Sequence, residues 1–381
     1  MPERQVPVCV DGRLAAANAT GVASYARAMR DALAATGPSP LILEDDQRGR
    51  FGVRASLRET IQRHMMGRLR SRLLLARDAR RLYAPDVYRL AQARFSATGQ
   101  LLILDAPGPP GIMHWTYPIP AWIRGWVNFY TIHDAIPMLG PELSGVAPDP
   151  LQRRIMAIGA VADRFLTVSD AARDQILSAF RLHPSSMANC GAAITALAPG
   201  DGHLPGNLRT GEYYLFCGLG EPRKNLPRLI AAWRASGTPF PLVLTGPDHD
   251  PAQREPGLII LPYQERQALI DLMRHARALL FPSLGEGFGL PVVEAMALGT
   301  PVLTANNGAL AEVANGSALL VDPLDEEAIA RGIGRLDHED ELRATLASLG
   351  RDRSRAFTVD RFGARLRQLH NEFTSDSRLD V

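Results

Sequence analysis

Two blocks of alternating short apolar runs and amphipathic stretches constrain how this 381-residue chain can fold. Such alternation is typical of βαβ units and a parallel sheet. In the first block we expect strands at 6–10, 41–43, 101–104, 112–115, 129–133 and 165–168, with helices near 22–35 and 171–180. In the second block we expect strands at 213–217, 242–245, 258–261, 279–281, 302–304 and 318–321, with helices near 226–235, 265–276 and 292–298.

Between the blocks, residues 198–211 are rich in Gly, Pro and polar residues, which is typical of an interdomain linker. We therefore expect an α/β protein with two Rossmann-like domains, 1–197 and 212–357, and the cleft between them is the default place for a site. A helix near 358–381 is expected to pack back on the first domain. The chain length agrees with two domains of roughly 150 residues or more.

Composition excludes several classes of protein. Apolar residues make up 46% and charged residues 22%, as in folded globular proteins. The net charge of +2 gives no global field toward nucleic acid. The odd set of three cysteines lacks metal-ligand spacing and indicates a reducing compartment. The start lacks the pattern of a secretion signal and no apolar run reaches ~18 residues, so we expect a cytoplasmic protein.

Basic residues are unusual in kind and in placement. Lys224 is the single lysine, and the other 41 basic residues are arginine. Thirteen arginines against three carboxylates crowd into 47–94, where apolar residues recur every fourth position from Leu57 to Leu73. This spacing predicts a basic amphipathic helix, which suits an anionic bilayer or a lipid diphosphate. The alternative is a helix packed on the first domain with solvated arginines.

The most specific motif is the glycine-rich stretch PSLGEGFGLPVVEAMALG at 282–299. It predicts a strand, a loop and then a helix, with Pro291 in the first turn and Gly299 at the end. Such a helix start points unpaired amides and a positive dipole end at the cleft, which favours phosphate. Glu286 in the loop and Glu294 in the expected first turn can accept from sugar hydroxyls, Glu294 from a ribose diol. The alternative for Glu294 is to complement the helix N-terminus.

A second strand, loop and helix motif, FCGLGEPRKN at 216–225, carries Arg223 and Lys224 at a helix entrance. Two adjacent cations there would neutralise a diphosphate, and a planar guanidinium and a compact ammonium do so in different ways. Alone, an Arg-Lys pair at a turn is commonly just solvated. Together with the EGFGLPVVE loop, the pair favours diphosphate binding.

With both motifs in place, the chain resembles the retaining GT-B glycosyltransferases of family 4, the group 1 type, over nearly its full length. The stretches 299–313 (GTPVLTANNGALAEV) and 318–325 (ALLVDPLD) match the same donor-domain pattern. The resemblance implies a C-terminal domain that holds a nucleotide-sugar, an N-terminal domain that holds the acceptor, and no metal or other cofactor. It implies that Arg223 and Lys224 grip the donor diphosphate, Glu294 the ribose and Glu286 the transferred sugar. It further implies that backbone amides contact sugar and phosphate at Gly287, Phe288, Gly289 and Leu290.

Two weaker matches lie in the N-terminal half. The stretch 11–29 resembles the family's first strand-to-helix loop, where a glycine, here Gly21, lets the backbone approach the donor phosphate. TIHDAIP at 131–137 resembles a strand end whose histidine, here His133, lies beside the transferred sugar. Adjacent strand residues point to opposite faces, so His133 and Asp134 need not form a dyad. The alternative for His133 is a satisfied structural histidine.

Aromatic residues gather just before His133. Trp115, Tyr117 and Trp122 are candidates for platforms that stack on an acceptor sugar. The alternative is that they pack as ordinary apolar bulk at the rim of the N-terminal domain.

The resemblance implies transfer of a hexose to an acceptor hydroxyl with retention, an EC 2.4.1 type activity. The 11–29 and 131–137 stretches look most like members that use GDP-mannose to extend lipid-linked oligosaccharides of bacterial exopolysaccharide or O-antigen. The Arg-rich segment 47–94 then suits a polyprenyl-diphosphate acceptor and peripheral contact with the inner face of the plasma membrane. UDP-hexose donors stay open, as does the choice between front-face attack and double displacement.

Two rival classes fit the sequence less well. A binding protein that kept the GT-B fold without turnover would be expected to lack a donor-binding group, yet Arg223, Lys224, Glu286 and Glu294 are all present. A nicotinamide-dependent dehydrogenase would need GxGxxG after the first strand, where this chain has DGRLAA.

Overall fold

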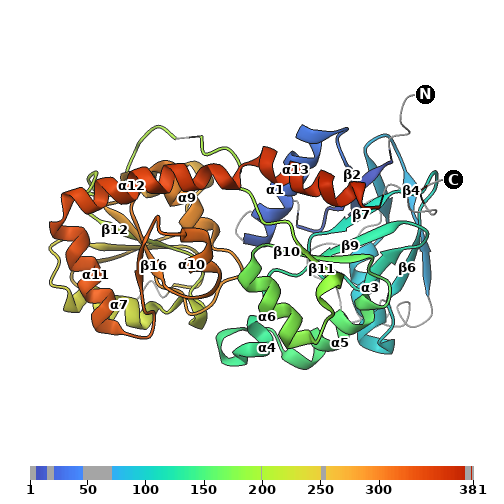
Figure 1. Ribbon diagram of the computed structural model, residues 1–381, viewed down its shortest axis with the longest axis horizontal. Coiled ribbons are helices and arrows are strands. Elements are labelled where there is room, and N and C mark those ends of the chain that lie inside the picture. Colours follow the sequence, from blue (N-terminus) through green and yellow to red (C-terminus); the bar gives the residue numbers. More distant parts are fainter. Residues whose placement is uncertain are drawn as a thin grey trace.

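The structure is a computed structural model that describes residues 6–14, 21–45, 71–198, 200–249, 255–373 and Leu379. The two larger β-sheets lie toward opposite ends of an elongated molecule, and helices cover both (Figure 1). We call the first sheet with its helices the N-terminal lobe and the second sheet with its helices the C-terminal lobe. The predicted α/β architecture of two Rossmann-like units is confirmed.

The N-terminal lobe is built, among the described residues, on an eight-stranded sheet in the order β11-β10-β9-β7-β1-β2-β5-β4, flanked by a small sheet β3-β6-β8. Neighbouring strands are parallel except β4 and β5. Its central strands are buried on both faces, which explains their continuous apolar runs. The strands are β1 (Val8–Asp11), β2 (Leu41–Asp45), β3 (Arg72–Leu74), β4 (Ala76–Arg77), β5 (Arg81–Ala84), β6 (Leu102–Asp105), β7 (Ile112–Trp115), β8 (Ala121–Ile123), β9 (Val127–Thr131), β10 (Arg164–Thr167) and β11 (Met187–Asn189).

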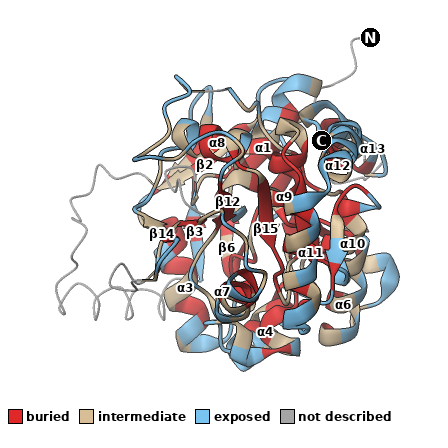
Figure 2. Cartoon of the chain, turned by 90° about the vertical axis from the view of Figure 1, so that its left-hand side faces the viewer, coloured by how far each residue is buried: buried red, intermediate tan, exposed pale blue. Residues whose placement is uncertain are grey.

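The C-terminal lobe is built on a parallel sheet in the order β14-β13-β12-β15-β16-β17. Figure 2 shows buried residues along β12 and β15, with exposed residues on the outer sides of the surrounding helices. This order places β12 and β15 side by side at the middle of the sheet, so the loops after these two strands meet. The strands are β12 (Tyr214–Cys217), β13 (Leu242–Thr245), β14 (Leu258–Leu261), β15 (Ala278–Phe281), β16 (Val302–Ala305) and β17 (Leu319–Val321).

Helices alternate with the strands in both lobes. The N-terminal lobe carries α1 (Gly21–Thr36), α3 (Val87–Thr98), α4 (Ile136–Leu139), α5 (Pro148–Gly159) and α6 (Asp170–Phe180), with 3-10 turns η1 (Pro141–Leu143) and η2 (Pro184–Ser186). The C-terminal lobe carries η3 (Pro222–Lys224), α7 (Leu226–Ala235), α8 (Arg266–His275), α9 (Leu290–Leu298), α10 (Gly308–Ala314), α11 (Glu326–His338) and α12 (Asp340–Ser354).

The C-terminal end of the chain returns to the N-terminal lobe. After α12, the turn η4 (Arg355–Phe357) leads into α13 (Val359–Asn371), which lies against α1 (Figure 1). Gly363 makes this contact close, because a Cβ at that position would meet the backbone of Ala32 and the side chain of Thr36. Because α13 follows α12 of the C-terminal lobe in the chain and packs on α1 of the N-terminal lobe, it connects the two lobes.

The Arg-rich segment differs from its prediction where it can be compared. Most of the expected basic helix, residues 57–73, lies outside the described residues, which leave out 46–70. Its expected end is wrong, because Arg72 and Leu73 belong to strand β3, and Leu73 is buried in the apolar cluster of the N-terminal lobe. The expected strand 129–133 ends at Thr131, so His133 follows β9 instead of lying in it.

A buried pair of histidines joins α13 to the N-terminal sheet. His114 in β7 and His370 in α13 approach to 2.7 Å between their Nε2 atoms, so one ring donates its proton to the other. Burial lowers the pKa of His370 to about 4 and also lowers the pKa of His114, with further lowering from its neighbour. Both rings are therefore neutral in the folded protein at neutral pH.

This pair predicts a pH-dependent stability. The unfolded chain takes up protons on these histidines near pH 6.5, whereas in the folded chain His370 has a pKa of about 4 and burial holds the pKa of His114 well below its ordinary value. Between those values the unfolded state binds more protons, so the free energy of unfolding falls as the pH falls. His370→Gln keeps a hydrogen-bonding group and removes one titrating ring. We expect its Tm to fall less than that of the wild type between pH 7 and pH 5, while His338→Gln, a change at an exposed histidine, keeps the wild-type slope. Equal slopes for wild type and His370→Gln would contradict the assignment.

Candidate functional site

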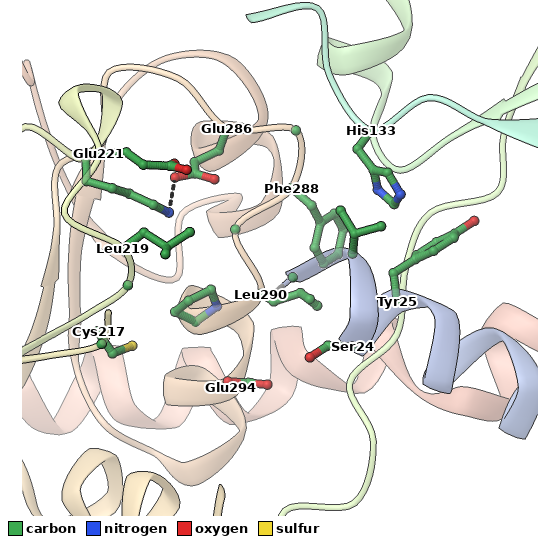
Figure 3. Close-up of a pocket in the computed structure, with 18 of the residues that line it drawn as sticks. Ser24, Tyr25, His133, Cys217, Leu219, Glu221, Glu286, Phe288, Leu290 and Glu294 are labelled. Carbon is green, nitrogen blue, oxygen red and sulfur yellow. Dashed lines mark hydrogen bonds and ion pairs between the residues drawn. The ribbon is translucent and has the colours of Figure 1, made fainter. Parts of the chain in front are cut away.

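A cavity of about 450 Å³ lies between the two lobes, where the carboxyl ends of their parallel strands face each other. The N-terminal lobe contributes Gly21, Tyr25 and His133 to its walls. The C-terminal lobe contributes the loops after β12 and β15 and the start of α9, as Figure 3 shows. Ligands of open parallel sheets bind at this edge. The structure thus brings the predicted donor-site residues together in one cavity, namely Gly21, His133, Arg223, Lys224, Glu286, Gly287, Phe288, Gly289, Leu290 and Glu294.

The glycine-rich loop leads from β15 into α9 with its backbone exposed to the cavity. Gly289 takes a φ of 96°, a left-handed conformation that favours glycine, and Pro291 lies in the first turn of α9. Within the described part of the chain, the amides of Gly287, Phe288, Gly289 and Leu290 have no hydrogen-bond acceptor. Unpaired amides at a helix N-terminus form an anion-binding site.

The two cations of the second motif share one carboxylate. Lys224 Nζ lies 2.6 Å from Glu286 Oε1, and Arg223 Nη1 lies 2.8 Å from Glu286 Oε2. Lys224 is buried, with its ammonium 4.5 Å from the centre of the Phe281 ring. Burial raises the pKa of Glu286, but Lys224 and Arg223 outweigh it, and the pKa is lowered overall. Glu286 is therefore ionised, and we call these three residues the charge triad.

Neighbouring residues fix the charge triad in place. Arg223 also pairs with Glu221 through Nε at 2.7 Å. Asn225, in a left-handed conformation with φ 62°, donates its side-chain amide to the carbonyl oxygens of Pro282 and Pro323 at 3.1 and 2.7 Å. Asn tolerates this backbone conformation, and its side chain ties three loops together. This explains why an asparagine follows the two cations.

Glu294 is held by an arginine that sequence reasoning missed. Arg266, the first residue of α8, donates to both oxygens of Glu294 at 2.6 and 3.1 Å, in the two-pronged geometry of an Arg–carboxylate pair. Glu294 is the fifth residue of α9, so the expected first-turn position is wrong by one residue. Nothing in the sequence separates Arg266 from the other arginines, because the pair depends on the packing of α8 against α9.

His133 is a neutral imidazole with a fixed orientation. Its Nε2 lies 2.9 Å from the carbonyl oxygen of Thr116, and since a carbonyl only accepts, Nε2 carries the proton and Nδ1 is an acceptor. Burial lowers the pKa of His133 to about 4. Tyr25 packs edge-on against the ring at 4.8 Å, and its hydroxyl lies 3.3 Å from the Thr131 hydroxyl. Among the described residues, no hydrogen bond joins His133 to Asp134, whose carboxylate accepts from the amide of Ile136.

The aromatic acceptor candidates lie elsewhere. Trp115 has no exposed surface, because it stacks on Tyr130 and donates its indole N–H to Asn128. The prediction that Trp115 offers a face to a sugar is wrong, because every residue of β7 is buried and the Trp115 ring does not reach the surface. Tyr117 and Trp122 are half-buried and do not line the cavity between the lobes.

No group of three or more His, Cys, Asp or Glu side chains among the residues that the structure describes is placed to hold a metal ion. None of the described helices is both long and apolar enough to span a bilayer.

Two Rossmann-like lobes that face each other across a ligand cavity define the GT-B fold. The fold of the chain is similar to that of a sucrose-phosphate synthase from Thermosynechococcus elongatus, with a TM-score of 0.65 and 20% identity over 98% of this chain and 100% of that one. Residues 206–353 match the family described as Glycosyl transferases group 1. The chain therefore has the GT-B fold, and the part of it that matches the group 1 glycosyltransferases lies in the C-terminal lobe.

The chain is also similar in sequence to named proteins. The chain is 30% identical to O-antigen chain mannosyltransferase B of Escherichia coli over 223 residues, which are 52% of this chain and 57% of that protein. The match thus spans little more than half of that relative. The chain is also 26% identical to a D-inositol 3-phosphate glycosyltransferase of Saccharomonospora viridis over 325 residues, 72% of this chain and 70% of that one.

The charge triad predicts competition between Glu286 and any anion that binds the two cations. Unit charges about 4 Å apart interact by ~4 kcal/mol at an effective dielectric constant near 20. Removing the charge with Glu286→Gln should therefore tighten binding of inorganic pyrophosphate by about tenfold or more at low salt. Isothermal titration calorimetry measures this, with Glu327→Gln, a change at an exposed carboxylate, as the control. Unchanged or weaker binding by Glu286→Gln would show that the cations do not hold the anion.

Proposed function

We propose that this protein is a retaining hexosyltransferase that transfers mannose from GDP-mannose to a lipid-linked glycan. The observation that carries the proposal is the meeting of buried cations and unpaired loop amides in the cavity between the lobes. A nucleoside diphosphate brings a pyrophosphate that needs both kinds of group. The name of the E. coli relative, an O-antigen chain mannosyltransferase, supports mannose and a polysaccharide acceptor.

In this proposal the C-terminal lobe binds the donor. Arg223 and Lys224 bind the diphosphate, and Glu286 turns from them to hydroxyls of the hexose. Glu294 accepts hydrogen bonds from the ribose hydroxyls, which replace one or both of its hydrogen bonds from Arg266. The amides of 287–290 contact the phosphate and the sugar, and Gly21 at the start of α1 lets the backbone approach the phosphate from the N-terminal lobe.

The chemistry then follows from where charge develops. The bond between the anomeric carbon and the β-phosphate oxygen breaks, and negative charge grows on that phosphate. Fixed cations and amides stabilise this charge more in the transition state than in the ground state. The acceptor hydroxyl attacks from the face that the phosphate leaves and gives its proton to a phosphate oxygen, so the configuration is retained. In this proposal the Nδ1 atom of His133, the ring nitrogen that can accept a hydrogen bond, binds a hydroxyl of the hexose, and the position of His133 in the cavity wall supports this role.

The acceptor is proposed to be a glycan on a polyprenyl diphosphate, bound by the N-terminal lobe at the inner face of the plasma membrane. The described part of the Arg-rich segment supports this, since Arg72, Arg77 and Arg80 are exposed and Leu74, which lies between Arg72 and Arg77 in the sequence, is 76% exposed. Exposed arginines next to an apolar side chain favour an anionic lipid surface.

A donor panel tests the proposed reaction. Release of free nucleoside diphosphate is measured with GDP-mannose, GDP-glucose, UDP-glucose and UDP-N-acetylglucosamine, each with and without a prenyl-linked glycan and with and without EDTA. Of the four donors, we expect only GDP-mannose to release its nucleoside diphosphate, in the presence of the acceptor. We expect this release to persist in EDTA, because Arg223 and Lys224 do the electrostatic work of a metal ion. Release from a UDP-sugar alone overturns the donor assignment, and loss of activity in EDTA overturns the metal-independent one.

Lys224→Ala tests the group that stabilises the leaving phosphate. Loss of one preorganised donor costs ~3 kcal/mol, on the order of a hundredfold in kcat. Turnover is measured at saturating donor, with the exposed Arg331→Ala as the control that should keep wild-type turnover. Because Lys224 is the only lysine, selective ¹⁵N-lysine labelling gives a direct readout of its ammonium when the donor is added. Near-wild-type kcat in Lys224→Ala would remove the leaving-group assignment.

A further inference from the structure

Contacts between the lobes gather at the N-terminus of α6, which begins at the end of β10 in the N-terminal lobe. Ser169 is the N-cap of α6, and its hydroxyl oxygen accepts from the amide of Ala172 at 3.0 Å. The same hydroxyl donates to the carbonyl oxygen of Gly287, in the glycine-rich loop of the other lobe, at 2.8 Å. A hydroxyl has one proton to donate, and Ser169 uses it across the cleft.

A carboxylate from the C-terminal lobe completes the same helix end. Glu312 in α10 accepts from the amides of Asp170 and Ala171 at 3.0 and 2.7 Å, one with each oxygen. These are first-turn amides of α6 that have no partner within their own helix, and a carboxylate there also meets the positive end of the helix dipole. Arg353 in α12 fixes the backbone around Glu312 by donating to the carbonyl oxygens of Glu312 and Val313.

The Ser169 contact also orients the loop that lines the cavity. A trans peptide is planar, with its carbonyl oxygen and amide hydrogen on opposite sides. When Ser169 holds the oxygen of Gly287, the N–H of Phe288 must point the other way. The backbone of Gly287 also packs tightly on His133, because a Cβ at Gly287 would collide with the His133 carbonyl oxygen.

We propose that Ser169 and Glu312 form a clasp between the lobes, which holds the cleft closed and sets the Phe288 amide toward the phosphate. Both are positioning residues, since they act through the loop and the helix and do not line the cavity. Opening the cleft breaks the contacts of the clasp and frees the Gly287–Phe288 peptide to rotate. Closure and formation of the amide site therefore occur together. The effect on phosphate binding rests on the proposed function, whereas the effect on lobe closure does not.

Small-angle X-ray scattering of the ligand-free protein tests closure without any donor. We expect a larger radius of gyration for Glu312→Ala than for the wild type, and an intermediate value for Glu312→Gln, whose amide oxygen still accepts one hydrogen bond. Glu326→Ala is the matched control, because Glu326 is an exposed glutamate in the first turn of α11 in the same lobe. Far-UV circular dichroism checks folding, and if Glu312→Ala does not fold, Glu312→Gln carries the test. Wild-type radii for the folded Glu312 variants would overturn the clasp.

GDP titration tests the link from the clasp to the phosphate site. Loss of one hydrogen bond of ordinary net strength predicts roughly fivefold weaker GDP binding by Ser169→Ala. A role in capping α6 alone would destabilise that helix and leave GDP affinity unchanged. If wild type binds GDP and Ser169→Ala binds it equally well, the positioning role is wrong. If wild type does not bind GDP, the proposed function fails, and the scattering result still decides the closure.

Discussion

The candidate site depends on holding two adjacent cations in the wall of the cavity between the lobes. A buried ammonium without a partner is costly, and Lys224 is buried against Phe281 with Arg223 beside it. Glu286 supplies the compensating charge from a loop of the same lobe. The protein therefore carries its own anion where it is proposed to bind another. The arrangement stabilises the empty site and lowers the affinity for any phosphate that must displace the carboxylate.

The same constraint explains why the loops around the cavity have such specific residues. The carbonyls that Asn225 binds belong to the loops after β15 and β17, so the cation loop cannot shift without breaking these hydrogen bonds. Gly289 has a left-handed backbone at the start of α9, and a Cβ there would press on Leu310. Short loops on rigid strands hold charged groups within hydrogen-bonding distance of one another, which a flexible surface loop does not.

Sequence patterns predicted the parts of this molecule that depend on local order. Strands such as Leu242–Thr245 and Ile112–Trp115 fall where the apolar runs lie, because a buried parallel strand needs apolar side chains on both faces. Glycine-rich turns after β12 and β15 place Lys224 and Glu286 near the sheet edge. Pairings made by packing were not predictable. Arg266 reaches Glu294 only because α8 lies beside α9, and Trp115 is buried only because β7 is a central strand.

The N-termini of α6 and α9 both lie at the interface between the lobes, and their first-turn amides are satisfied differently. Each has unpaired first-turn amides and a positive dipole end, so each is an anion site in principle. At α6 the Glu312 carboxylate fills that site from the opposite lobe. At α9, within the described residues, the N-cap makes no side-chain hydrogen bond and the preceding loop amides are unpaired. Because Glu312 already satisfies the N-terminus of α6, the proposed phosphate site is the N-terminus of α9, beside the two cations. In the clasp that we propose, the Glu312 carboxylate that holds the lobes together thereby also directs the ligand to α9.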